Sequence, residues 1–196
     1  MKEAATTNIE GKLIASFKEL AMKEPVEKIT IREIADGAGV IRTTFYYHFR
    51  DKYELIERII QQDLIAPLLE LLGQDRIDDM FYEILKRLDA ERAFYRRLAR
   101  MEGQNSFGEL LQQNISAVLQ ELISAPGFNQ SQIIRTGKYR WLTPKFTADY
   151  YAQSITFTLI TFLNTDPPAT PEEGAEVFDY VVCHTLNETI VEWYRK

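Results

Sequence analysis

Residues 29–52 read ITIREIADGAGVIRTTFYYHFRDK, and this stretch determines how the rest of the chain is interpreted. Thr30 and Glu33 have the spacing of a capping box, which predicts the start of a short helix. Two glycines then supply a turn, and another short helix is expected at about 42–49. Two short helices joined by such a turn form a helix-turn-helix, a motif whose second helix enters the major groove of DNA.

The helix expected at 42–49 has a composition that suits DNA better than water. At helical spacing Phe45 and Phe49 share one face, which must point inward. The remaining side chains are then expected to point largely outward: Arg42, Thr43, Thr44, Tyr46, Tyr47 and His48. Arginine reads guanine edges, hydroxyl groups hold phosphates, and aromatic rings meet thymine methyl groups. We therefore expect this helix to bind double-stranded operator DNA.

The same stretch resembles the DNA-binding domain of the TetR family of transcription regulators. The likeness covers roughly residues 8–56 and rests on 29–35, 39–40 and 44–52, above all on Phe-Tyr-Tyr-His-Phe ahead of Asp-Lys. The resemblance implies a homodimer in which each second helix of the motif enters the major groove.

The resemblance also implies roles for single residues. It implies that Arg32 and Arg42 lie near base edges, with Thr43 beside them. It further implies that six residues mainly position the phosphate backbone: Thr30, Thr44, Tyr46, Tyr47, His48 and Lys52.

Position 41 departs from the family pattern. A small polar residue commonly caps the helix at this position, whereas this chain has Ile41. Loss of a cap costs on the order of 1 kcal/mol. Ile41 either offers a methyl contact to a thymine or packs locally against the preceding helix or a neighbouring ring, and local packing is the commoner case.

The charge of the chain is unevenly distributed over its 196 residues. Residues 1–58 contain ten Lys/Arg and ten Asp/Glu, so the remaining 13 and 19 place the whole net charge of −6 on residues 59–196. A neutral segment still binds DNA when its cations cluster on one face. No run approaches the roughly 18 apolar residues of a membrane span. The lone Cys183 fits a reducing compartment, and we expect a cytoplasmic protein.

Periodic apolar residues predict helices along the whole chain and no strand, and hence an all-α fold. An N-terminal helix is expected to begin at a capping box of Thr7 and Glu10 and to end before Pro25. A helix that begins at Asp51 is expected to end where it meets Pro67. Further helices are expected at 77–88, 92–101, 107–123, 147–163 and 172–194, with a loop at 126–146.

This pattern divides the chain into two domains. Residues 1–56 are expected to form the helix-turn-helix DNA-binding domain, and residues 57–196 a helical bundle for regulation and dimerisation. The segments 94–98, 106–107 and 150–151 resemble one variety of TetR-family C-terminal domain, which names no ligand.

A ligand pocket is expected between the helices at 77–88, 107–123 and 147–163. Their inward faces are expected to present Phe81, Leu85, Phe107, Leu111, Tyr151 and Phe157. Such a lining predicts an apolar or aromatic effector, with Arg96 at the rim favouring a carboxylate. The stripe of Arg92, Arg96 and Arg100 has three interpretations: an anionic effector site, salt bridges with acidic neighbours, or transmission between the domains.

The helices at 147–163 and 172–194 have apolar residues on more than one face. A surface helix of a monomer needs only one apolar stripe, so the surplus predicts a homodimer through these two helices. No catalytic set, phosphate-binding glycine loop or zinc-ligand spacing is found, so we expect no enzyme activity, no metal and no cofactor. The leading hypothesis is a repressor that a small molecule releases from operator DNA. The alternative is a co-regulator of the same fold that binds a ligand or another regulator without binding DNA.

Overall fold

The computed structural model describes residues 2–74, 79–124 and 140–183 of the chain, and these residues form helices and no strand. The helical elements are α1 (Lys2–Lys23), α2 (Ile31–Gly37), α3 (Arg42–His48), α4 (Lys52–Ile59), the π-helical turn η1 (Ile60–Ile65), α5 (Ala66–Gly73), α6 (Met80–Ala90), α7 (Arg92–Leu98), α8 (Phe107–Ser124), α10 (Pro144–Asn164), α11 (Pro171–Phe178) and the π-helical turn η3 (Asp179–Cys183). The predicted all-α fold is confirmed.

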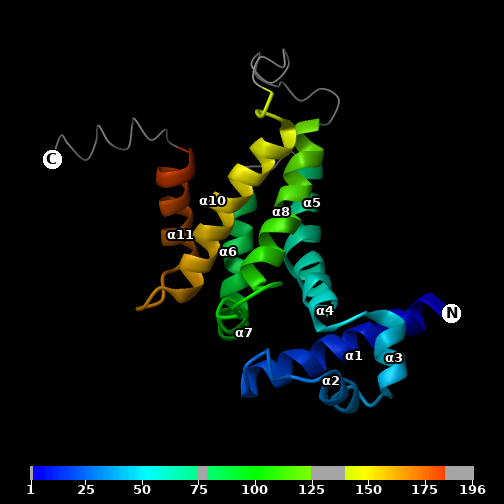
Figure 1. The fold of residues 1–196 in the computed structure, drawn as a ribbon. Coiled ribbons are helices and arrows are strands. Elements are labelled where there is room, and N and C mark those ends of the chain that lie inside the picture. The colour runs from blue at the N-terminus through cyan, green and yellow to red at the C-terminus, as the bar shows by residue number, and fades with distance from the viewer. Residues whose placement is uncertain (1, 75–78, 125–139, 184–196) are drawn as a thin grey trace, which may run out of the picture.

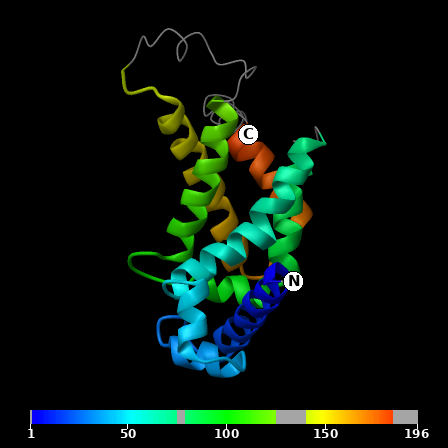
Figure 2. The ribbon, with the colours of Figure 1, turned by 90° about the vertical axis from the view of Figure 1, so that its right-hand side faces the viewer.

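The small α1–α3 unit lies at one end of the molecule (Figure 1). Helix α4 leads away from this unit into a bundle formed by the later helices, and the view turned by 90° shows the same separation (Figure 2). In the described part of the chain, no helix is long and apolar enough to cross a membrane.

The α1–α3 unit is held together by a small apolar core. Leu13 and Phe17 of α1, Ile34 of α2 and Phe45 of α3 are fully buried. Burial of each such side chain contributes about 1.5–3 kcal/mol relative to leaving it exposed. Because these side chains come from three helices, the core fixes the angle between α2 and α3.

Local signals place most helix starts correctly. The predicted capping box at Thr30 is present in full, since the Thr30 hydroxyl accepts from the Glu33 N–H and the Glu33 carboxylate accepts from the Thr30 N–H. Asp51 caps α4 by accepting from the N–H groups of Tyr53 and Glu54. The Glu54 carboxylate accepts from the N–H of Arg50 at 2.6 Å. In a capping box it would accept from the N–H of the cap residue, Asp51, instead.

The predicted start of the first helix at Thr7 is wrong. Helix α1 begins at Lys2, so Thr7 and Glu10 lie inside it. The intervening Ala4 and Ala5 are strong helix formers, and no breaker precedes Thr7 to stop the helix from extending. Glu10 is therefore free to form ion pairs with residues of α3 and α4.

The predicted helix end at Pro67 is also wrong. The chain passes from α4 through η1 into α5 without a break, and the N–H of Ala66 donates to the carbonyl of Gln61, five residues back. Proline lacks an N–H and its ring clashes with the carbonyl four residues earlier in an ordinary helix. The wider π-helical turn just before Pro67 avoids this conflict and lets the helix continue.

The later helices agree with the expected ones in order but differ at their ends. Helix α10 begins at Pro144, because Thr143 accepts from the Phe146 N–H and Pro144 suits the first turn. Most of the loop expected at 126–146 and residues 184–194 of the last expected helix lie outside the described residues. Helix α6 begins at Met80, after the undescribed residues 75–78.

The expected domain boundary at residues 56 and 57 falls inside α4. Ile56 and Ile59 of this helix are fully buried on either side of that boundary. The division of the chain at this point stays a prediction, and α4 belongs physically to both parts.

A polar cluster joins the small unit to the bundle. The Lys18 ammonium of α1 donates to Asp63 Oδ2 of η1 at 2.8 Å and to Glu91 Oε2 at 2.9 Å, just before α7. The Tyr95 hydroxyl also donates to Asp63, at 3.2 Å. Burial alone would lower the pKa of Lys18, but its hydrogen bonds to Asp63 and Glu91 raise the pKa above the ordinary value.

Gly37 is required where α2 crosses α1. A Cβ at this position would lie 2.3 Å from Ser16 Oγ, whose hydroxyl donates to the Ile34 carbonyl. We expect Gly37→Ala to lower the free energy of unfolding by about 1–3 kcal/mol. In a Ser16→Ala background the same change is expected to be neutral or slightly stabilising, because the nearest atom is then the Cβ at 3.4 Å. Urea unfolding of the four proteins measures this, and equal losses in both backgrounds would contradict it.

Candidate nucleic-acid interface

Helix α3 is fixed from behind by two aromatic side chains. Phe45 and Phe49 are buried, as predicted, and their ring centroids lie 5.7 Å apart. The turn before α3 contains Gly39 with a φ of +70°, a backbone conformation that favours glycine. The N–H of Val40 returns to the Ala35 carbonyl at 3.0 Å, which closes the turn against α2.

The outward face of α3 is polar and aromatic. Arg42, Thr43, Tyr46 and Tyr47 are exposed, with 81% of Tyr47 accessible, and Thr44 is half-buried. The Arg42 guanidinium donates to the Tyr46 hydroxyl at 3.3 Å. Among the described residues, no carboxylate forms an ion pair with Arg42. Its positive charge is thus available to a partner.

Ile41 does not pack locally. The side chain is 70% exposed at the N-cap position of α3 and makes no capping hydrogen bond there. The interpretation of Ile41 as local packing is therefore wrong. An exposed isoleucine beside the outward face of α3 is free to contact a partner instead.

The expectation that His48 points outward is wrong. Only 3% of its side chain is exposed, and Nδ1 lies 3.5 Å from Glu10 Oε1 of α1. Glu10 also faces Arg58 of α4 at 3.8 Å. This contact turns the ring at the end of α3 toward α1 and away from the outer face. His48 therefore positions α3 rather than forming part of the exposed face.

Lys52 binds the protein's own backbone. Its ammonium donates to the carbonyl oxygens of Val26, Glu27 and Ile29 at 2.8, 2.9 and 3.0 Å. Burial lowers the pKa of Lys52. The three donors of this ammonium are thus used to hold the segment between α1 and α2 against the start of α4.

Thr30 and Arg32 lie on the exposed side of α2. The Thr30 hydroxyl donates to the Glu33 carboxylate at 2.7 Å, and this hydrogen bond lowers the pKa of Glu33. Arg32 lies 3.5 Å from the Asp36 carboxylate, with both side chains exposed. An exposed pair of this kind contributes little and leaves Arg32 free to exchange partners.

Comparison with known proteins agrees with this geometry. A family model described as bacterial regulatory proteins, tetR family, matches residues 13–59, and a model described as transcriptional regulator C-terminal region matches residues 75–182. The chain belongs to the TetR family. It is a transcriptional regulator with an N-terminal helix-turn-helix, as the resemblance implied.

Individual relatives of this TetR-family chain are distant. A protein of Haemophilus influenzae described as an uncharacterized HTH-type transcriptional regulator is 34% identical over 65 residues, which are 33% of this chain and 32% of that protein. Two crystal structures of NalD, described as the secondary repressor of the MexAB-OprM multidrug efflux pump in Pseudomonas aeruginosa, share the fold at 18% identity. Their TM-scores are 0.57 and 0.55, with 89% and 87% of this chain and 94% and 92% of NalD covered.

Four of the residues expected to line a ligand pocket in this TetR-family bundle, Phe81, Leu85, Phe107 and Leu111, pack in or against the common apolar core. Leu85, Phe107 and Leu111 are fully buried in the common core. Phe81 stacks on Phe178, with ring centroids 3.5 Å apart.

The inward orientation expected for Tyr151 and Phe157 is wrong. Tyr151 is 45% and Phe157 70% exposed on α10. Helix α10 packs mainly on α8, and its buried residues are small in its first half and larger toward its end: Ala148, Ala152, Thr156, Leu159, Phe162 and Leu163. Small side chains allow two helices to approach closely, and this choice of buried stripe turns both aromatic rings outward.

The arginine stripe of α7 divides into different roles. Arg92 donates to Asp89 at 2.6 Å and to the carbonyl oxygens of Phe162 and Ala169, so it joins α6 to the end of α10. The salt-bridge interpretation is therefore confirmed for Arg92. Arg96 is half-buried, and its Nε has no hydrogen-bond partner among the described residues, whereas Arg100 is exposed.

Sequence reasoning missed the residues that hold the interface in place. Glu10, Lys18 and the backbone-binding role of Lys52 depend on partners far away in the sequence. The only local signal is that these three charged residues lie beside apolar positions, Glu10 and Lys18 in α1 and Lys52 at the start of α4. That signal does not identify their partners.

Replacement of Lys52 tests its structural role. We expect Lys52→Met to lower the free energy of unfolding by about 1–3 kcal/mol, because three carbonyl oxygens lose a shared charged donor. Lys28→Met is the matched control, since this lysine is exposed in the same segment. Thermal unfolding by circular dichroism measures both, and equal melting temperatures for the two variants would show that the backbone contacts of Lys52 are dispensable.

Proposed function

We propose that this TetR-family regulator binds double-stranded operator DNA through α3, represses transcription from it, and is released by a small-molecule effector. The observation that supports DNA binding is the outward face of α3, where Arg42, Thr43, Tyr46 and Tyr47 are exposed together. Arginine, hydroxyl groups and rings on a helix that is braced from behind match the chemistry of a major groove.

Within this proposal some exposed residues contact base edges and others contact phosphates. Arg42 and Thr43 at the start of α3, with Arg32 on α2, contact base edges, and exposed Ile41 contacts a thymine methyl group. Three hydroxyl groups contact phosphates: Thr44, Tyr46 and Tyr47. The Thr30 hydroxyl instead caps α2, because it donates to the Glu33 carboxylate and accepts from the Glu33 N–H. His48 and Lys52 act by positioning α3 and the adjoining backbone, because their polar groups already have partners inside the protein.

Repression and release rest on other grounds. NalD, which shares this fold, is described as a repressor, and that description supports the same mode of action here. An apolar or aromatic effector would have to enter among Leu85, Phe107 and Leu111, which are packed in the core. Release by an effector of that class stays a prediction.

We further propose a homodimer formed by α10 and α11. Exposed Phe146, Tyr150 and Phe157 lie at steps of four and seven along α10, and exposed Val177 and Val181 lie four apart at the end of α11 and in η3. Exposed apolar rows on neighbouring helices are typical of interfaces rather than of solvated surface. A two-fold axis here would present two α3 helices to half-sites about 34–36 Å apart.

Arg42→Ala tests the DNA contact. We expect operator binding to weaken by about 1–3 kcal/mol with the fold unchanged, since one charged base contact is lost. The operator is first selected from random-sequence duplexes with the parent protein, and affinity is then measured by gel-shift titration at fixed salt. Arg97→Ala, an exposed arginine of α7, is the control and should bind as the parent does. Failure of the parent to select any sequence would favour the co-regulator that does not bind DNA.

Phe157→Glu tests the dimer. The parent is expected to have twice the chain mass of 22.8 kDa in light scattering at micromolar concentration, and the variant is expected to approach a single chain. A carboxylate placed on each side of a two-fold interface would be desolvated and would repel its copy. Tyr47→Glu introduces the same charge on α3 and should leave the mass unchanged. Equal masses for the two variants would refute this interface.

A further inference from the structure

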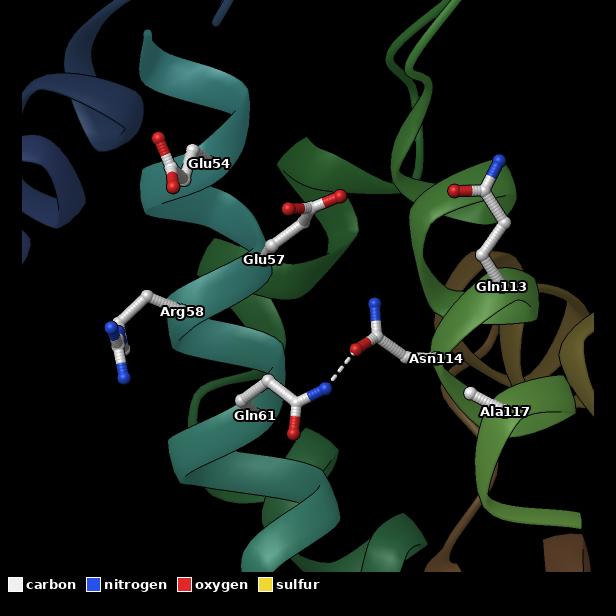
Figure 3. Close-up of a pocket in the computed structure, with 7 residues that line it drawn as sticks. All are labelled: Glu54, Glu57, Arg58, Gln61, Gln113, Asn114 and Ala117. Carbon is white, nitrogen blue, oxygen red and sulfur yellow. Dashed lines mark hydrogen bonds between the residues drawn. The ribbon is translucent and has the colours of Figure 1, made fainter. Parts of the chain in front are cut away.

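A polar cleft lies between α4 and α8, outside the apolar core of the bundle. Its volume is about 400 Å³, and its lining is Glu54, Glu57, Arg58, Gln61, Gln113, Asn114 and Ala117. Figure 3 shows Glu57 and Gln61 projecting toward α8, whereas Arg58 projects from the opposite side of α4. A volume of this size accommodates a small organic molecule.

The charges around this cleft leave one carboxylate without a close partner. Glu54 is paired with Arg50 at 3.1 Å, and Arg58 faces Glu10 at 3.8 Å. Among the described residues, no hydrogen bond or ion pair engages the half-buried carboxylate of Glu57, on which only a longer-range attraction to Arg50 acts. The local charge of the cleft is therefore negative and is concentrated on Glu57.

The rest of the lining offers neutral hydrogen-bonding groups. The Gln61 amide donates to Asn114 Oδ1 across the cleft, and the Asn114 amide donates to the Leu110 carbonyl at 2.8 Å. The carbonyl oxygen of Gln61 and the exposed amide of Gln113 remain for a ligand (Figure 3). Acceptor oxygens on both walls, together with one carboxylate, suit a molecule with an ammonium or guanidinium group and further N–H donors.

We propose that this cleft binds a small organic cation of the amine or guanidine class, with Glu57 as its counter-ion and Gln61 and Gln113 as hydrogen-bond partners. A bound cation joins α4 to α8 beside the Gln61–Asn114 hydrogen bond. Helix α4 starts at Lys52, three residues after the buried Phe49 at the C-cap position of α3. Occupancy of the cleft thereby alters the position of α3 and the affinity for DNA, and this second step alone rests on the function proposed above.

The binding step is tested on the full chain without DNA. Isothermal titration calorimetry with 1,4-diaminobutane and with agmatine is expected to give saturable binding of one molecule per chain. Succinate, of similar length and opposite charge, is expected to give none. Glu57→Gln should weaken binding by about tenfold or more, because a charge-assisted hydrogen bond is lost. Absence of saturable binding of either amine would overturn the proposal.

Two further variants separate a site from general attraction to an acidic chain. Glu102→Gln removes one exposed carboxylate elsewhere and should change affinity by less than about twofold. Ala117→Phe retains Glu57 but fills the cleft from an exposed position on α8, and it should abolish binding while preserving the melting temperature. If Glu57→Gln and Glu102→Gln weaken binding equally, or if Ala117→Phe binds as the parent does, the cleft is not the site.

The regulatory step is tested separately. Gel-shift titration of the selected operator with and without 1,4-diaminobutane should show a change in affinity for the parent and none for Glu57→Gln. If calorimetry shows the predicted binding but operator affinity stays constant, the regulatory step is wrong and the cation site stands. If the chain selects no operator, the proposed function is wrong. The calorimetry without DNA then still tests whether the cleft binds the cation.

Discussion

One ammonium group joins the DNA-binding unit to the bundle by charged contacts. Lys18 of α1 binds Asp63 of η1 and Glu91 before α7 at the same time, so a single side chain joins three elements far apart in the sequence. The same ammonium lies over the Phe94 ring, 5.3 Å from the ring centroid. Asp63, which also accepts from buried Tyr95, is the better shielded of the two carboxylates and provides the stronger contact.

A second charged residue of α1 connects the small unit to α4. Glu10 lies two helical turns before Lys18 and faces both His48 of α3 and Arg58 of α4. The bundle therefore contacts α1 near both ends of its buried segment, and α3 is attached to the same helix. Because the packed core of this unit resists internal deformation, a displacement of α4 would carry α1 and α3 with it.

The helix-turn-helix could be predicted from sequence because its signals are local. The capping box at Thr30 and the two buried rings of α3 act within a few residues of one another. The family resemblance places His48 and Lys52 on the DNA side. Local sequence patterns cannot correct this, because the partners of these two residues, on α1 and on the segment before α2, lie 38 and 23–26 residues away. Periodicity likewise predicts that α10 has apolar residues on several faces. It does not predict which face packs on α8, and this packing leaves Phe157 exposed.

The packing of the bundle determines where a ligand can bind with the smallest loss of packing free energy. The bundle interior is filled by fully buried side chains such as Leu85 and Phe107, so a ligand there must first displace well-packed atoms. The cleft beside α4 is already open and polar, and its floor is a single amide pair, Gln61 and Asn114. A ligand shifts an equilibrium only by its differential affinity for the two states. If the two states differ in the position of α4, a ligand that contacts both α4 and α8 binds them with different affinity. A ligand that contacts one helix alone would bind both states equally.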